Sequence, residues 1–248
     1  MKITVFLIGA ALSLIFVSCS KDDEVDKLIT LDSSAKTLYF GDEYQIKATS
    51  NTPLLYSSED EYHASVSEPG LVTARFVGET NVVLSNGNDT KKVLITVKAQ
   101  SNLYPDPNME FGISKSALIT KYGTPDDETE TGILYDNFSN AAEAVMYIFD
   151  ENNKLKSTAV VVKTSYSSNL GTFLVERYLP VDIDNLIFVN ALKPEDATML
   201  IGADLYNLSY WLVVYAPYNS TTRSSQIKAK SFSSEFDKLF RQLEKMDF

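Results

Sequence analysis

The apolar positions follow three different patterns along the chain. Residues 1–18 carry an almost unbroken apolar run behind Lys2, residues 28–99 alternate apolar and polar positions with period two, and residues 108–248 mix this alternation with helical periodicity. Residues 100–107 lie between the second and third patterns and hold two prolines, which predicts a semi-rigid linker. The patterns therefore predict a multidomain chain, with an all-β domain at 28–99 and an α+β domain at 108–248.

The segment 28–99 has the alternation of short, half-buried strands. Leu38 and Phe40 alternate with polar or intermediate residues, Val93, Ile95 and Val97 close the segment with the same spacing, and Gly41 and Asn86-Gly87 mark turns. Successive side chains of a strand point to opposite faces, so one face of each strand would pack inward. This predicts an all-β sandwich.

Six short motifs in this segment resemble the group-two bacterial immunoglobulin-like domain. They are Leu38-Tyr39-Phe40-Gly41, Tyr44-Gln45-Ile46-Lys47-Ala48, Tyr56-Ser57-Ser58-Glu59-Asp60, Gly70-Leu71-Val72-Thr73-Ala74, Val77-Gly78-Glu79-Thr80-Asn81-Val82 and Val93-Leu94-Ile95-Thr96-Val97. Tyr56 departs from the family, which commonly has Trp at this place. The resemblance implies an Ig-like sandwich over 28–99 that serves as a spacer or adhesive module and has no catalytic residues.

Residues 108–248 are expected to form two helix-plus-three-strand units on an antiparallel sheet, followed by a C-terminal helix. Ser114 caps the first expected helix, which ends at Gly123 before Pro125, and Ser168 begins the second, which Pro180 stops. The expected strands are 133–136, 144–150, 155–163, 186–191, 198–205 and 210–216. In the last helix, Phe236, Leu239, Phe240 and Leu243 form one apolar stripe that is expected to dock on the sheet.

The stretch from Phe111 to Pro125 is similar to the helix-Gly-x-Pro opening of small outer-membrane assembly lipoproteins and of the β-lactamase inhibitor protein repeats. This resemblance covers only the first helix of the domain. It implies antiparallel α+β layers rather than a parallel sheet.

The N-terminal run predicts export and lipidation. It has about 15 residues, short of the ~20 that a helix needs to span a bilayer, so residues 1–18 are read as a cleaved signal. Phe16-Val17-Ser18-Cys19 resembles a bacterial lipobox, although the family prefers Leu where Phe16 stands, and Cys19 is the only cysteine. The resemblance implies an acylated Cys19 at the start of a tether, residues 19–27, and attachment to the outer membrane. The lysine-then-acidic run from Cys19 to Glu24 resembles a surface-export tag; an ordinary secretory signal is the alternative.

The amino-acid composition argues against several kinds of binding site and covalent link. The net charge of −11 argues against nucleic-acid binding, and a single cysteine allows no intramolecular disulfide. The one histidine, His63, lies in the expected Ig-like domain, and zinc sites usually need several His and Cys. Asp150-Glu151-Asn152-Asn153 and Asp182-Ile183-Asp184 lack the Gly and distal Glu of an EF-hand loop. No metal and no cofactor are therefore expected.

Aromatic residues on the expected strands are the remaining candidates for a site. Tyr147, Tyr210, Trp211 and Tyr215 would anchor a ligand if they lie on a sheet face that helices leave uncovered; otherwise they belong to the core. The sequence thus predicts a lipid-anchored envelope protein in which an Ig-like spacer presents a non-catalytic C-terminal recognition domain to a glycan or a protein. A purely structural envelope role is the alternative, and a glycoside hydrolase using paired carboxylates is another.

Overall fold

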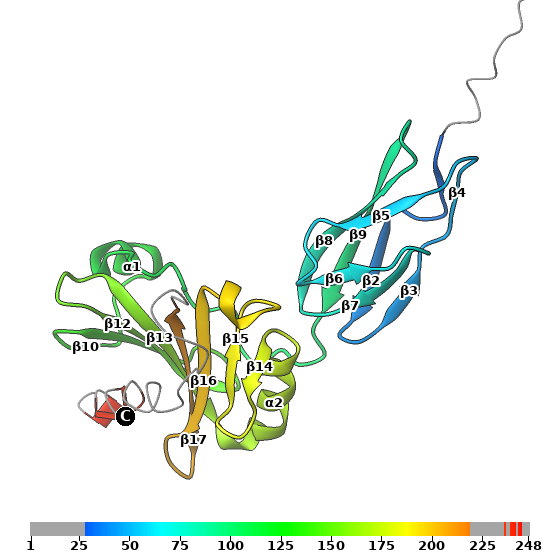
Figure 1. The fold of residues 1–248 in the computed structure, drawn as a ribbon. Helices are drawn as coiled ribbons and strands as arrows, with labels where there is room; N and C mark the ends of the chain where they lie inside the picture. The colour runs from blue at the N-terminus through cyan, green and yellow to red at the C-terminus, as the bar shows by residue number, and fades with distance from the viewer. Residues whose placement is uncertain (1–27, 219–235, 237–238, 242, 245–248) are drawn as a thin grey trace, which may run out of the picture.

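The computed structural model describes residues 28–218, 236, 239–241 and 243–244 (Figure 1). The expected signal, Cys19 and the acidic tag lie outside the described residues. Within the described part of the chain, no helix is long and apolar enough to span a membrane.

Residues 28–98 form a β-sandwich around one apolar core. A four-stranded sheet, ordered β2-β9-β8-β5, faces a three-stranded sheet, β3-β7-β6, and β1 pairs with β4. The strands are β1 (Thr30–Leu31), β2 (Ala35–Tyr39), β3 (Glu43–Gln45), β4 (Ala48–Thr49), β5 (Leu55–Ser58), β6 (Ala64–Val66), β7 (Leu71–Ala74), β8 (Gly78–Ser85) and β9 (Thr90–Lys98). Val93, Ile95 and Val97 are buried, with Val72 and Val82 from other strands in the same core. The period-two alternation therefore has the expected cause, a single buried face.

The C-terminal domain is built on one antiparallel sheet of eight strands, ordered β10-β11-β12-β13-β17-β16-β15-β14. The elements are α1 (Lys115–Tyr122), β10 (Asp127–Glu128), β11 (Gly132–Asp136), β12 (Ala142–Phe149), β13 (Leu155–Lys163), α2 (Ser167–Val175), β14 (Leu179–Asp182), β15 (Ile187–Val189), β16 (Met199–Leu205) and β17 (Tyr210–Pro217), with short 3-10 turns at Thr164–Tyr166 and Pro194–Asp196. Among the regular elements of the described chain, strands thus predominate over a few short helices.

Each half of this sheet is a helix followed by four strands, not the three expected. The last strands of the two halves, β13 and β17, pair at the centre, so the strand order runs outward in the same way on both sides. The additional strands are the short edge strands β10 and β14. Pro180 lies within β14 rather than directly ending α2, because an edge strand tolerates a residue that cannot donate a backbone hydrogen bond.

Helical residues cover both faces of the sheet. Leu118 of α1 and Leu170, Phe173 and Leu174 of α2 pack in the core on one face. On the other face, Phe236, Leu239 and Leu243 are buried together with sheet residues. These described residues of the expected C-terminal helix are helical, and their docking on the sheet is confirmed. The expectation of an uncovered sheet face was wrong, because sheet residues on this second face, among them Met146, Val161 and Val214, are buried as well.

The first helix begins and ends where the sequence predicts. The Ser114 side chain accepts a hydrogen bond from the Ala117 N–H at 3.2 Å. At the other end, Gly123 has φ of +91° and its N–H donates to the Ile119 carbonyl at 2.8 Å. Local capping chemistry is sufficient to set both boundaries.

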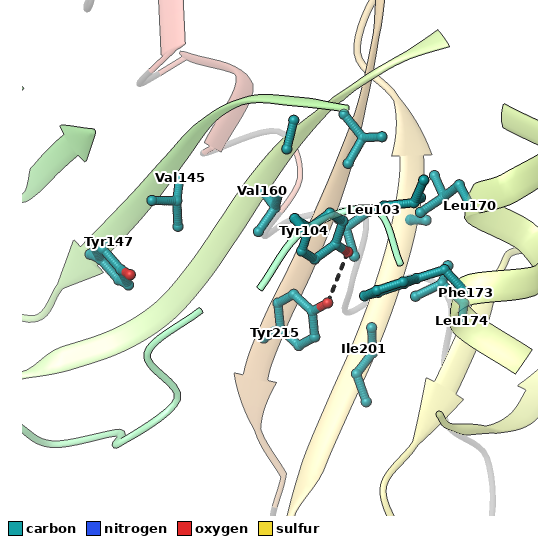
Figure 2. Close-up of a cluster of buried hydrophobic side chains, with 14 of the residues drawn as sticks. Leu103, Tyr104, Val145, Tyr147, Val160, Leu170, Phe173, Leu174, Ile201 and Tyr215 are labelled. Carbon is teal, nitrogen blue, oxygen red and sulfur yellow. Dashed lines mark hydrogen bonds between the residues drawn. The ribbon is translucent and has the colours of Figure 1, made fainter. Parts of the chain in front are cut away.

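Residues 100–108, here called the strap, differ from the expected linker. Leu103 and Tyr104 are only 7% exposed and lie in the core between α1, α2 and the sheet. Figure 2 shows Tyr104 directed at Tyr215, with 3.0 Å between their hydroxyl oxygens. The Tyr104 ring also lies 4.5 Å from that of Phe173. The strap is drawn onto the sheet because its apolar side chains fill the space that the two short helices leave open.

Candidate binding site

Two of the four aromatic candidates are core residues. Tyr147 and Tyr215 are each 1% exposed, on the sheet face that α1, α2 and the strap cover. The Tyr147 hydroxyl accepts a hydrogen bond from the Asn108 N–H at 3.3 Å, and Tyr215 pairs with Tyr104. Burial raises the pKa of both phenols. Their expected role as surface anchors is therefore wrong, because the strap occupies the space in front of them.

The other two candidates remain partly exposed at the start of β17. Tyr210 packs at the edge of the core beneath the C-terminal helical residues, and Trp211 packs at the edge of the core beneath α2. The Trp211 indole N–H donates to the Ser167 hydroxyl at 2.8 Å. These two rings therefore flank one end of the sheet from opposite faces.

The hairpin that joins β16 to β17 carries the most exposed apolar side chain at this end of the sheet. Leu208 is 93% exposed and Leu205 is 45% exposed. Residues 205–210 are called the hairpin tip below. The sequence reading missed Leu208, although a Leu inside an Asn- and Ser-containing turn is a detectable signal, since turn positions are usually polar.

Hydrogen bonds hold the backbone of the hairpin tip while the Leu208 side chain stays in water. The Asn207 side chain accepts from the N–H groups of Ser209 at 2.8 Å and Tyr210 at 3.0 Å. Thr164 donates its N–H to the Ser209 carbonyl at 2.8 Å and its hydroxyl to the Leu208 carbonyl at 3.0 Å. The tip is thus tied to the chain that leads into α2.

A shallow hollow of about 300 Å³ lies beside the hairpin tip and is lined by Asp136, Asn137, Glu143 and Tyr210. Glu143 forms an ion pair with Lys163 at 3.0 Å. Partial burial raises the pKa of Asp136, and the carboxylates of Asp126, Glu143 and Asp127 raise it further. The site therefore combines an apolar projection with an acidic recess.

We expect Asp136→Asn to raise the melting temperature slightly at pH 7. The folded-state pKa of Asp136 is raised, so its contribution to stability is largest below the usual pKa of Asp, about 3.9, and is lost as the pH rises through the folded value. Asn is uncharged at every pH, whereas Asp136 becomes protonated as the pH falls. The difference in melting temperature between variant and wild type should therefore shrink at a pH of about 3.5. Thermal melts at both pH values check this, with Asp184→Asn on an exposed turn as the control; a variant less stable than wild type at pH 7 would contradict it.

Other polar residues singled out in the sequence serve local structure. His63 lies with its Nδ1 3.1 Å from the Phe76 carbonyl oxygen. The Asp150 carboxylate accepts from the N–H groups of Asn152 and Lys154, and that of Asp182 accepts from the Asn185 N–H, so each closes its own turn. Across the residues that the structure describes, no three His, Cys, Asp or Glu side chains are grouped to hold a metal ion.

No protein-family model and no curated protein matches the chain. Among solved structures, domains 4–9 of surface layer protein SbsC are similar at 14% identity with a TM-score of 0.27, over 79% of this chain and 27% of that one. Domains 5–6 of the S-layer protein SbsC align at 14% identity with a TM-score of 0.26, over 79% of this chain and 86% of that one. The chain thus spans about a quarter of the first of these structures. The similarity is a distant one between β domains.

Proposed function

We propose that the protein is a non-catalytic, lipid-anchored cell-surface protein that binds a partner protein through the hairpin tip. The observation that carries this is Leu208, 93% exposed on a turn whose backbone is tied by hydrogen bonds. Burying such a side chain against a partner contributes about 1.5–3 kcal/mol, and a turn already held in place loses little entropy on binding.

The side chains of the tip favour a protein over a glycan as the ligand. Leu205 and Leu208 are aliphatic, whereas sugar rings stack on flat aromatic faces, and Tyr210 and Trp211 keep only part of their rings exposed. A protein surface can offer an apolar recess for Leu208 and a basic side chain for the hollow at Asp136 and Glu143. Such a partner would cover roughly 800 Å² on each side.

The order of the domains suits this role. Acylation of Cys19 would attach the chain at its N-terminus, and the β-sandwich would then act as the spacer. The described chain enters the sandwich at the end where the Ile29 N–H donates to the Asp89 carboxylate at 2.9 Å. The opposite end of the sandwich lies against the C-terminal domain (Figure 1), where the Val77 N–H donates to the Glu176 carbonyl. The recognition domain would thus be carried at the far end of the spacer.

Replacing Leu208 with Asp tests the binding site. We expect Leu208→Asp to abolish capture of a partner protein from host and envelope extracts without changing the melting temperature, because the side chain contacts solvent. Leu55→Asp is the matched control, since Leu55 is 73% exposed on the sandwich. Binding that depends on Leu55 and not on Leu208 would place the binding site on the β-sandwich instead. Binding only on a glycan array would identify a sugar ligand instead, and no ligand in either screen would favour a structural envelope role.

Replacing Cys19 tests the anchor separately. We expect Cys19→Ala to move the protein from the detergent phase to the soluble fraction, because two or more acyl chains give stable membrane attachment and the variant cannot receive them. Metabolic labelling with a fatty acid analogue should mark the wild type only. A Cys19→Ala protein that still partitions with detergent like the wild type would contradict the anchor.

A further inference from the structure

We infer that the β-sandwich and the C-terminal domain are locked into one rigid body by a joint centred on Glu176. The joint consists of Tyr62 and Val77 from the sandwich, Gln100 and Ser101 from the start of the strap, and Glu176 and Arg177 from the turn after α2. This differs from the independent domains that a semi-rigid linker would give.

Glu176 is the central residue because its buried carboxylate holds the connecting chain. It is 2% exposed, and its carboxylate accepts hydrogen bonds from the N–H groups of Gln100 and Ser101, each at 3.1 Å. A carboxylate that accepts several backbone N–H groups forms charge-assisted bonds, which are stronger than neutral ones. The first residues after the sandwich are therefore bonded directly to the C-terminal domain.

The same turn also bonds to the sandwich itself. The Glu176 carbonyl accepts the Val77 N–H at 2.8 Å, and the Arg177 carbonyl accepts the Tyr62 hydroxyl at 2.6 Å. The Tyr62 ring is stacked on Phe76, with 4.5 Å between their centroids. Partial burial raises the pKa of the Tyr62 hydroxyl, as expected for a group that lies between the two domains.

Arg177 connects the start of the strap to α2. Its guanidinium lies 3.8 Å from the centroid of the Phe173 ring and donates to the carbonyls of Ser101 and Phe173, each at 3.2 Å. The Ser101 hydroxyl donates to the Asn169 carbonyl at 2.9 Å. Contacts from the sandwich, the connecting chain and α2 thus meet at two adjacent residues, and rotation between the domains would break several of them together.

A rigid joint would fix where the hairpin tip points. The tip is tied to Thr164, in the 3-10 turn that leads into α2, and the joint follows the end of that helix. A helix of nine residues spans about 13 Å, so a fixed joint gives the tip a fixed direction relative to the spacer. With a flexible linker between the domains, the tip would instead sample many directions relative to the spacer.

Distance measurements between two spin labels test the rigid body. Cys19 is the only native cysteine, so labels at Lys47→Cys in the sandwich and Glu195→Cys in the C-terminal domain can be placed in a Cys19→Ser chain without other thiols. We expect one narrow distance distribution for this chain, and a broad distribution after Glu176→Ala. Glu151→Ala, on an exposed turn, is the matched control and should leave the distribution narrow.

Tyr62→Phe keeps the proposal testable if Glu176→Ala does not fold. This variant removes only the hydroxyl that donates to Arg177 and keeps the ring on Phe76, so we expect an intact fold by circular dichroism and a distribution broader than the wild type. A broad distribution in the unsubstituted chain would overturn the inference. A narrow distribution that neither Glu176→Ala nor Tyr62→Phe changes would also overturn the role given to these residues.

Discussion

Tyr104→Ala should lower the free energy of unfolding of the protein by about 3 to 5 kcal/mol, the loss typical of a large aromatic removed from a core. Tyr104 lies in a stretch whose two prolines suggest a linker, where such a change would have almost no effect. In the structure its ring packs against Phe173 and its hydroxyl pairs with that of Tyr215. The substitution would leave a cavity between α2 and the sheet, because the two short helices cannot close over the gap.

Denaturant unfolding followed by circular dichroism measures this loss. Tyr104→Phe keeps the ring and removes the hydroxyl, so it should lose only about 1 kcal/mol. Asp106→Ala is the control within the strap, since Asp106 is exposed, and should change the stability by less than about 0.5 kcal/mol. If Tyr104→Ala and Asp106→Ala were equally stable, the strap would have to be a free linker in solution.

Gly78→Ala should destabilise the β-sandwich by about 2 to 6 kcal/mol, the sum of a backbone and a packing effect. Gly78 has φ of +145°, a backbone conformation that residues other than Gly rarely adopt. A Cβ at this position would lie 2.2 Å from Cε1 of the His63 ring. His63 cannot move freely, because its ring contacts Tyr62 in an edge arrangement at 5.4 Å and its Nδ1 lies against the Phe76 carbonyl.

Two further variants separate the effects at Gly78. Gly41→Ala introduces a Cβ at φ of +83° with nothing within 4 Å, so only backbone strain remains and the loss should be about 1–2 kcal/mol. Combining Gly78→Ala with His63→Ala removes the clash and should be more stable than the two separate losses predict. Strictly additive losses in urea unfolding would show that the His63 ring is not the obstacle.

Local chemistry was sufficient to predict most individual elements. The Ser114 cap and Gly123 set the ends of α1, and the alternation of Val93, Ile95 and Val97 identified a strand with one buried face. The stripe of Phe236, Leu239 and Leu243 correctly indicated a helix docked on the sheet. In each case the signal is the spacing of residues within one element, so the sequence of that element is enough to show it.

The candidate site could be predicted only in part. Tyr210 and Trp211 are at the site, but Tyr147 and Tyr215 are buried, and Leu208 was missed. Period-two spacing shows that these residues alternate between the faces of a strand, and it does not show which segment covers each face. For Tyr215, that segment is the strap, since its hydroxyl meets that of a residue 111 positions away.

The sequence by itself determined the local elements of this protein: the strands of the sandwich, the capped first helix and the apolar stripe near the C-terminus. Only the tertiary structure decided that β13 pairs with β17, that the strap fills the core, that Glu176 bonds to the connecting chain, and that Leu208 stays in solvent. The physical reason is the range of the interactions. Periodicity and capping depend on neighbours within a few residues, whereas burial and carboxylate bonding depend on which distant segments come together when the chain folds.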